Sequence, residues 1–205
     1  MANLIAYYSR KGENYWAGDI KVLEKGNTER VAEFVQEAVG GDLFEIETVK
    51  EYDADYYKCI DDAKAELQAD ARPEVKRYLE DAGLSIDDYD TIFLGYPNWW
   101  GTCPMCVFTF LEHYDLSGKR IVPFCTNEGS GMGGSEKHLK KICPNATIEK
   151  GLSITGNQAY WAAGGGIYIQ GESAEITLST ATEGATIWFA TSADGVTFGD
   201  FTEYT

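Results

Sequence analysis

Residues 91–112 read TIFLGYPNWWGTCPMCVFTFLE, and this stretch decides the fold. Its first five residues form a short apolar run that ends in glycine, as expected of a buried strand. Pro97 has no N–H to donate to a β-ladder and Gly101 favours a turn, so the strand gives way to a loop. Pro104 suits the first turn of a helix, and apolar residues follow it at helical spacing. The stretch therefore predicts a strand, a loop and a helix in direct succession.

Two adjacent tryptophans, Trp99 and Trp100, lie in this predicted loop. Large aromatic side chains are costly to leave on a loop, so the pair indicates either a flat ligand or partner surface, or a cap over the core. Loops at strand ends are where α/β folds bind their ligands. From these residues alone, the ligand site and the core cap are equally supported.

Strands and helices alternate along the first three quarters of the chain. Apolar runs predict strands at residues 4–8, 43–46, 91–95, 120–125 and 146–149, with Leu152 as a further candidate. Helical patterns lie at residues 29–39, 56–69, 104–113 and 136–143, and the second is expected to resume after Pro73 and run to Gly83. Residues 13–26 are polar and predict an irregular insertion, after which Asn27 and Thr28 are expected to cap the first helix. Because parallel strands need such crossovers, the predicted fold class is α/β, with a five-stranded parallel sheet between helices on both faces.

Charge and composition limit the partners of the protein. The 205 residues carry 17 basic and 33 acidic side chains, a net charge of −16, which opposes binding to nucleic acid or to an anionic membrane. No apolar stretch approaches the ~20 residues of a transmembrane helix, and the N-terminus lacks the pattern of a signal peptide. We therefore expect neither a nucleic-acid nor a membrane partner.

Five cysteines are scattered along the sequence, at positions 59, 103, 106, 125 and 143. An odd, scattered set without a signal peptide indicates reduced thiols and a cytoplasmic protein. Zinc is weakly supported, because there is one CxxC and neither histidine lies at finger spacing from it. Cys103 and Cys106 have the spacing of a redox dithiol at a helix N-terminus, but ordinary apolar packing is the more economical interpretation.

Three loops at the carboxyl ends of predicted strands carry the candidate chemistry. In the first, Ser9, Asn27 and Thr28 offer neutral donors at a helix N-terminus and Lys11 adds charge, which suits a phosphate. The motifs GxxxxGK[ST] and GxGxxG are absent, so a nucleotide P-loop and a Rossmann dinucleotide site are disfavoured. The second loop offers tryptophan surfaces, and glycines in the third allow backbone to approach a ring edge. A phosphate and a flat ring together describe FMN.

Three segments of this chain resemble the flavodoxin family. They are Tyr8-Ser-Arg-Lys with Gly26-Asn-Thr, residues 90–101 (DTIFLGYPNWWG) and residues 126–131 (TNEGSG), and residues 54–73 also look typical of one branch. The resemblance covers about residues 3–156 and implies a flavodoxin-like fold that holds FMN without a covalent bond. Two features depart from the family pattern: the insertion at residues 13–26 splits the phosphate loop, and the usual final helix has no clear counterpart.

The resemblance also implies a set of FMN-binding residues. By position, the phosphate would be held by Ser9, Lys11, Asn27 and Thr28. One side of the isoalloxazine would be lined by Pro97, Asn98, Trp99, Trp100 and Gly101. The other edge of the ring would be approached by Asn127, Glu128, Gly129, Ser130 and Gly131. Because the flavin performs the redox chemistry, no catalytic side chain and no metal ligand is expected. For Thr28 a simple helix cap, and for Glu128 a solvated carboxylate, remain the alternatives.

Several functions are compatible with such a site. The first is electron transfer or oxidoreduction with bound FMN, toward a redox partner protein or a small electron acceptor. An NAD(P)H-dependent quinone-type reductase is the second, and a binding module with a vestigial flavin site is the third. The negative charge mildly favours docking to basic redox partners. Whether the protein is an enzyme stays open.

The last quarter of the chain differs in character. Residues 157–205 contain six acidic residues, no Lys or Arg, and Thr- and aromatic-rich segments at 167–169, 175–179, 186–190 and 196–204. This pattern predicts a β-rich extension after a flavodoxin-like domain at residues 1–156. Such a short β segment seldom stands alone, so we expect it to pack on the main domain or to form a homodimer with a second subunit.

Overall fold

The computed structural model describes residues 2–16, 19–155, 158–160, 187–189 and 202–204. Its main sheet contains β1 (Asn3–Tyr7), β4 (Asp42–Glu45), β5 (Thr91–Pro97), β6 (Arg120–Asn127), β7 (Thr147–Ile148), β8 (Leu152–Thr155) and β9 (Gln158–Tyr160). The strand order is β4-β1-β5-β6-β8-β9, and β7 also pairs with β6. All pairs are parallel except β8 with β9. The predicted α/β fold with a parallel sheet is confirmed, and the fifth strand position is divided between β7 and β8.

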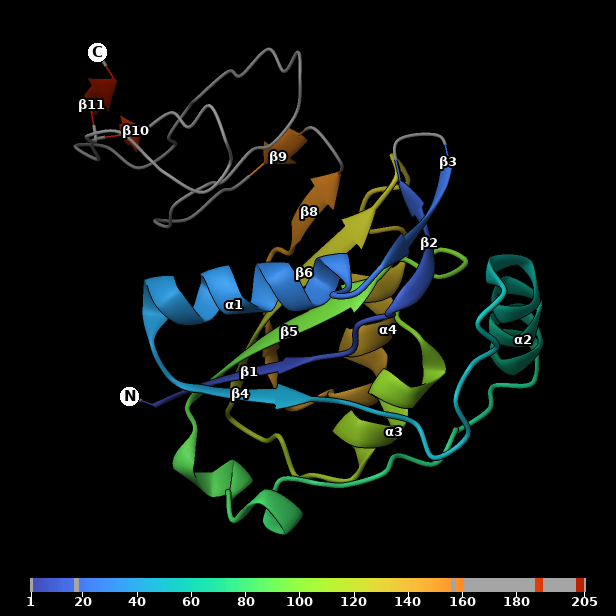
Figure 1. Ribbon diagram of the computed structural model, residues 1–205. Coiled ribbons are helices and arrows are strands. Elements are labelled where there is room, and N and C mark those ends of the chain that lie inside the picture. The colour runs from blue at the N-terminus through green and yellow to red at the C-terminus, as the bar shows by residue number, and fades with distance from the viewer. Residues whose placement is uncertain (1, 17–18, 156–157, 161–186, 190–201, 205) are drawn as a thin grey trace.

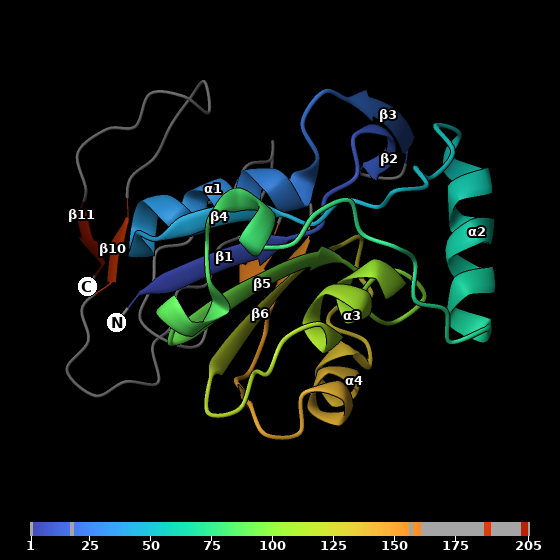
Figure 2. The ribbon, with the colours of Figure 1, turned by 90° about the horizontal axis from the view of Figure 1, so that it is seen from below.

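Helices cover both faces of this sheet (Figures 1 and 2). One face carries α1 (Asn27–Val39), and the other carries α3 (Met105–Glu112) and α4 (Ser135–Ile142). The remaining helix, α2 (Tyr56–Gln68), lies beyond the end of the sheet, next to the hairpin of β2 (Gly12–Trp16) and β3 (Asp19–Leu23). Within the part of the chain that the structure describes, no helix has the length and apolar character to cross a bilayer.

The core is divided by the sheet because successive residues of a strand point to opposite faces. In β1, Ile5 packs with Ala32 and Val35 of α1, whereas Leu4 and Ala6 belong to the larger cluster on the other face. All of these side chains are buried, as expected for a parallel sheet covered on both faces.

Residues 13–26 are not irregular as predicted, because they contain the antiparallel hairpin β2–β3. Tyr15 faces Ile20 across the hairpin, and Glu13 faces Val22. β-Branched and aromatic residues favour strands, but the charged residues between them hide the alternation in the sequence.

The expected helical continuation through Val75 and Leu79 to Gly83 is also wrong. Val75 forms an antiparallel bridge with Thr48, and the N–H of Lys76 donates to the carbonyl of Glu47 at 2.8 Å. Pro73 favours an extended residue before it, and the chain then pairs with a segment distant in sequence. A short 3-10 turn at Glu80–Ala82 is the helical part that remains.

The C-terminal region is described in three short pieces. β9 lies within the range predicted as the extension and extends the main sheet, while β10 (Ile187–Phe189) pairs antiparallel with β11 (Thr202–Tyr204). These two strands fall inside the expected β segments at 186–190 and 196–204. The expected strands at 167–169 and 175–179 lie outside the described residues.

Candidate functional site

Three loops meet at the carboxyl ends of β1, β5 and β6, where α/β sheets of this strand order bind ligands. We call them the phosphate loop (residues 8–12 with 24–28), the tryptophan loop (96–103) and the glycine loop (126–135). Thr28 of the phosphate loop and Thr126 of the glycine loop share a hydrogen bond of 2.8 Å between their hydroxyl oxygens. The N–H of Asn98 in the tryptophan loop donates to the carbonyl of Thr126 at 2.9 Å. The sequence-predicted loops therefore form one contiguous site.

The phosphate loop is closed by contact between Ser9 and Gly26, although the hairpin separates them in sequence. Gly26 is the N-cap of α1, so Asn27 and Thr28 are the first helical residues and not the caps that were predicted. Ser9 supplies the missing cap, because its Oγ accepts the N–H of Glu29 at 3.0 Å. A Cβ on Gly26 would lie 2.2 Å from that Oγ and 2.5 Å from the carbonyl oxygen of Arg10. Glycine is therefore required for this closure.

Several hydrogen-bond donors converge at the start of α1. Helix N-termini leave their first N–H groups without intrahelical acceptors, and these groups carry partial positive charge. Glu29 donates to Ser9 and Arg30 to Gly26, whereas the N–H groups of Asn27 and Thr28 have no acceptor among the described residues. The Ser9 hydroxyl keeps its hydrogen, and in the Thr28–Thr126 pair one of the two hydroxyl hydrogens is not used. This donor set matches an anion.

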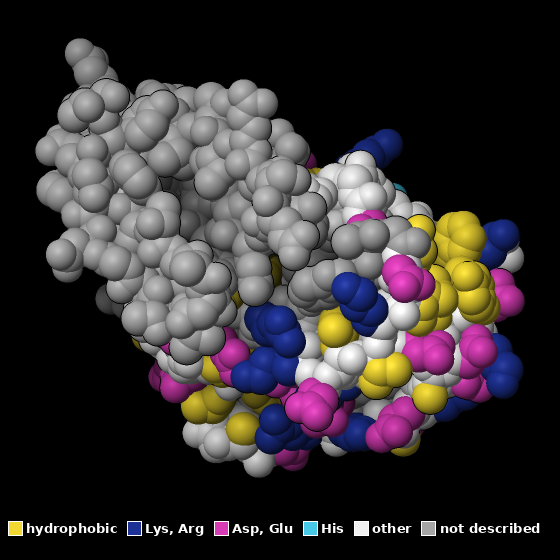
Figure 3. All heavy atoms as spheres, turned by 45° about the horizontal axis from the view of Figure 1, so that its top comes forward, with side chains coloured by type: hydrophobic (Ala, Val, Ile, Leu, Met, Phe, Trp, Pro, Cys, Tyr) yellow, Lys and Arg dark blue, Asp and Glu magenta, His cyan; other side chains and the backbone are white. Residues whose placement is uncertain are grey.

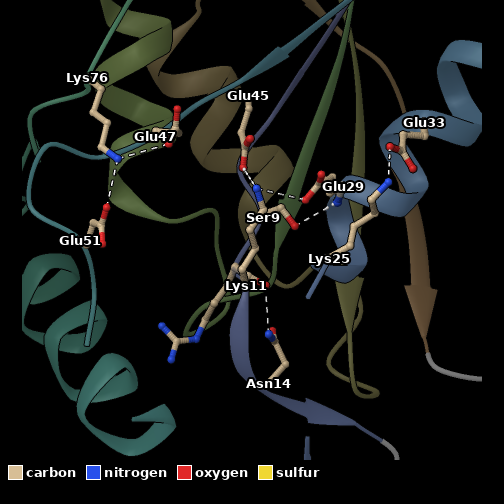
Figure 4. Close-up of polar contacts among 11 residues, drawn as sticks. Ser9, Lys11, Asn14, Lys25, Glu29, Glu33, Glu45, Glu47, Glu51 and Lys76 are labelled. Atoms are coloured by element: carbon tan, nitrogen blue, oxygen red, sulfur yellow. Dashed lines mark hydrogen bonds and ion pairs between the residues drawn. The ribbon is translucent and has the colours of Figure 1, made fainter. Parts of the chain in front are cut away.

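Lys11 is held by carboxylates and does not stand alone at the phosphate loop. Its Nζ lies 3.6 Å from Oε2 of Glu29 and 3.4 Å from Oε1 of Glu45 (Figure 4). Burial lowers the pKa of Lys11, but these two carboxylates outweigh it and raise the pKa above its usual value. The lysine charge is thus already compensated, so the neutral donors of the loop define the anion site.

Trp99 packs inward, against the core. Its ring meets Tyr8 edge-on at a centroid distance of 5.4 Å and Tyr52 at 4.9 Å. Its backbone N–H and carbonyl bond to Thr102, which closes the turn. Trp99 therefore supports the loop from beneath, in agreement with the core alternative.

Trp100 has the opposite character. It is 48% exposed, and its φ of 54° lies in the left-handed region that bulky residues avoid at a cost of about 1–2 kcal/mol. Its Nε1 donates to the carbonyl of Ile60 in α2 at 2.8 Å, and Nζ of Lys64 lies 4.8 Å from its ring centroid. An exposed aromatic held in a strained conformation at a strand end is a feature of binding sites.

The glycine loop is organised by Asn127 at the end of β6. Its Oδ1 accepts the N–H groups of Gly129 and Gly131, each at 2.9 Å, and its Nδ2 donates to Ser153 Oγ at 2.9 Å. Glu128 and Ser130 are exposed at the tip of the loop. Asn127 thus shapes the loop from within, and the residues at the tip face outward.

Pro97 and Gly101 bound the tryptophan turn. Pro97 is the last residue of β5, and Gly101 has a φ of 83° that favours glycine. The Gly101 carbonyl accepts the N–H of Gly134 at 2.7 Å, which joins the tryptophan loop to the start of α4. Every residue predicted for the site from the sequence therefore lies on one of the three loops, whereas direct contact with FMN stays a prediction.

Arg10 is a residue of this region that sequence analysis missed. It is 9% exposed, and among the described residues its guanidinium has no carboxylate within ion-pair distance. Instead its Nε donates to the carbonyl of Glu13 and its Nη2 to the carbonyl of Ala54, both at 2.9 Å. The Glu13 carboxylate in turn accepts the N–H of Tyr56 at 2.8 Å. Arg10 thereby ties the phosphate loop and the hairpin to α2.

Exposed aromatic and aliphatic side chains surround the loops on the side of the hairpin and α2. Tyr15, Val22, Tyr57 and Trp100 are all exposed. Figure 3 shows hydrophobic side chains gathered on one side of this face, with acidic side chains beside them. The side of the site formed by the hairpin and α2 therefore presents exposed apolar side chains.

The cysteines do not form a reactive group. All five are free and buried. Burial raises the pKa of Cys103 well above its usual value and also raises that of Cys106, so both stay protonated near neutral pH. Since thiolate is the reactive form, this environment opposes the dithiol interpretation.

A separate pocket of about 170 Å³ lies at the opposite end of the sheet. Its lining includes Leu111, Ile142 and Cys143, at the C-terminal ends of α3 and α4. None of the three loops contributes to it, and strand ends with convergent donors are the better indicator of a ligand site. The candidate site is therefore assigned from the loops.

A family model described as flavodoxin matches residues 22–161 of this chain. The chain belongs to the flavodoxin family. No curated protein matches the sequence. The matched segment of this flavodoxin-family chain contains the helix α1, the tryptophan loop and the glycine loop.

Solved structures agree with the family assignment. A protein of Bacteroides eggerthii assigned as a flavoprotein is 33% identical, with a TM-score of 0.60 over 75% of this chain and 87% of that chain. A similarly assigned protein of Bacteroides uniformis is 31% identical, with a TM-score of 0.60 over 76% of this chain and 90% of that chain. A Lactobacillus acidophilus flavoprotein, solved in complex with FMN, is 23% identical, with a TM-score of 0.56 over 74% and 91%. At that identity the last similarity shows the fold alone.

Proposed function

We propose that this protein binds FMN non-covalently across the three loops and uses it in electron transfer or oxidoreduction. The observation that carries the proposal is the convergence of unused donors at the start of α1 with the tryptophan and glycine loops, joined through Thr126. Membership of the flavodoxin family supports a flavin, and one structural neighbour was solved with FMN.

The phosphate end of FMN fits the donors of the phosphate loop. The N–H groups of Asn27 and Thr28 and the hydroxyl of Ser9 would hold it, with the positive end of α1 behind them. The closure of Gly26 against Ser9 forms a cradle that a Cβ would fill. Lys11 sits between two carboxylates, so we assign it to shaping the loop and not to direct phosphate binding.

The ring end of FMN fits between the tryptophan loop and the glycine loop. The indole of Trp100 is exposed although it contacts Ile60 and Lys64, whereas the ring of Trp99 packs against two tyrosines at the core. We therefore assign Trp100 as the stacking surface. The exposed tip at Glu128 and Ser130 would approach the far edge of the ring. When bound, FMN supplies the redox chemistry, and these residues orient it and limit the access of water.

FMN binding is tested by its fluorescence and absorption. Titration of the purified protein into FMN should quench flavin emission to a saturating end point, and riboflavin, which lacks the phosphate, should bind much more weakly. Equal affinity for FMN and riboflavin would contradict the proposed phosphate site. A solution in which FMN emission never changes would favour a binding module with a vestigial site.

The role of the flavin follows from how it is reduced. Reduction in two separate one-electron steps would support an electron carrier that docks to a basic redox partner in the cytoplasm, for which the net charge of −16 is suited. Rapid bleaching by NADPH, followed by turnover with a quinone, would support the reductase. The exposed apolar side chains beside the site are compatible with either acceptor.

A further inference from the structure

Asn98 uses both ends of its side-chain amide to join the tryptophan loop to the glycine loop. Its Nδ2 donates to the carbonyl of Gly131 at 2.7 Å, and its Oδ1 accepts the N–H of Gly101 at 2.9 Å. Its own N–H donates to the carbonyl of Thr126 at 2.9 Å. One residue therefore contacts the start and the middle of the glycine loop while closing its own turn.

We propose that Asn98 is a positioning residue that sets the spacing between the tryptophan loop and the glycine loop, and so the width of the slot for the flavin ring. The proposal rests on the proposed function and revises the expected role of Asn98 from flavin ligand to spacer. Its oxygen and one of its two amide hydrogens are already used within the protein.

The surroundings make this link between the two loops specific. Both backbone polar groups of Gly131 are engaged, because its N–H donates to Asn127 and its carbonyl accepts from Asn98. Nearby, the backbone of Gly133 approaches the Gly101 carbonyl so closely that a Cβ would lie 2.5 Å from its oxygen. This backbone contact joins the two loops at Gly101, and the side chain of Asn98 extends the connection to Gly131.

A slot of fixed width favours binding because the loops are ordered before the ring arrives. Ordering mobile loops on binding lowers affinity, and a preorganised site avoids that loss. Without the amide, the two loops would keep their backbone contacts and the 2.9 Å hydrogen bond from the Tyr96 hydroxyl to Ser135 at the far end of the glycine loop. The link to Gly131 would be lost, and the ligand would have to order that part of the loop. The expected consequence is weaker FMN binding and a changed ring environment, with the fold retained.

Two variants and one control test this inference. Asn98→Ala removes both side-chain bonds, and Asn98→Asp keeps the acceptor for Gly101 but loses the donor to Gly131. Asn3→Ala is the control, because Asn3 Nδ2 makes a comparable bond of 2.9 Å to the Val39 carbonyl at the other end of β1. Each protein is titrated with FMN at a temperature where all are folded, and the absorption bands and reduction potential of the bound flavin are recorded.

We expect the Kd for FMN to rise about tenfold in both Asn98 variants, which corresponds to about 1.4 kcal/mol, the size of one or two neutral hydrogen bonds. The flavin bands or potential should shift in both, and neither should change in Asn3→Ala. Wild-type affinity and spectrum in Asn98→Asp would overturn the inference while leaving FMN binding in place. Failure of the wild-type protein to bind FMN would overturn the proposed function as well, so the two failures are distinct.

Discussion

Replacement of Gly26 by alanine is the sharpest test of the phosphate loop. The backbone of Gly26, with φ −68° and ψ 156°, is accessible to alanine, so the substitution adds no backbone strain. The added Cβ would lie 2.2 Å from Ser9 Oγ, 2.5 Å from the Arg10 carbonyl oxygen and 3.1 Å from its carbon. Ordinary contacts are near 3.5 Å, so one side of the loop must move by about 1 Å.

The expected loss of stability follows from three contributions. Overpacking of this kind costs about 1–3 kcal/mol, and a weakened bond from the Glu29 N–H to Ser9 costs about 1 kcal/mol. The smaller conformational entropy of alanine in the unfolded chain offsets about 0.4–1 kcal/mol. The free energy of unfolding should therefore fall by about 1–3.5 kcal/mol. FMN affinity should fall as well, because the donors at the start of α1 are displaced.

Urea unfolding of the protein without FMN measures the first effect, and FMN titration of the folded variant measures the second. Gly83→Ala is the control, since Gly83 has a φ of 73° and open space around it, far from the loops. It should lose about 1–2 kcal/mol through backbone strain but bind FMN normally. Ser9→Ala/Gly26→Ala removes the nearest clash but also the cap on the Glu29 N–H, and the Arg10 oxygen remains at 2.5 Å. Stability should therefore recover little, if at all, relative to Gly26→Ala. A Gly26→Ala variant with wild-type stability and affinity would refute the geometry of the closed loop.

Three further predictions concern the rest of the site and the thiols. Trp99→Ala should lower the free energy of unfolding by about 3 kcal/mol, because its ring packs against the core. Trp100→Ala should lower it by about 1 kcal/mol or less but should weaken FMN binding more than Trp99→Ala does, because Trp100 is exposed at the site. Urea unfolding and FMN titration of the two variants measure these effects. Arg10→Lys should destabilise by about 2 kcal/mol in urea unfolding, because one ammonium does not reproduce the planar fork that reaches two carbonyls. Burial raises the pKa of Cys59 and Cys143 to about 11 and that of Cys125 to about 12, so the folded chain keeps protons that the unfolded chain loses near pH 8.5. Stability should therefore fall as pH rises from about 8.5 toward 11–12, and an unfolding midpoint in urea that is the same at pH 7.5 and 9.5 would contradict this.

The fold was predictable because its signals are local. The buried strands are short apolar runs, and the first four (β1, β4, β5 and β6) are each followed along the chain by a helix. The alternation of these elements restricts the sheet to a few topologies. The tryptophan loop was recognisable for the same reason, since Pro97 and Gly101 interrupt the strand within a few residues of Trp99 and Trp100.

The errors concern contacts between segments distant in sequence. Val75 joins Thr48 across a loop, and Arg10 reaches the Ala54 carbonyl, and neither pairing leaves a periodic pattern in the sequence. The different roles of Trp99 and Trp100 depend on Tyr8 and Tyr52 as neighbours and on the carbonyl groups of α2. Adjacent identical residues cannot be distinguished by composition or spacing, so only the packed structure separates them.

The insertion in the phosphate loop shows how a large change in sequence can leave a site intact. Because β2 and β3 pair from Gly12 with Leu23 to Trp16 with Asp19, the two ends of the inserted segment lie side by side, about 5 Å apart as in any ladder. Ser9 and Gly26 therefore meet almost as they would in an uninterrupted loop. An irregular insertion of equal length would need an additional constraint to bring its ends together, since loop closure is entropically unfavourable. The hairpin provides that constraint through its own ladder, and Arg10 and Glu13 then use its base to hold α2 against the site.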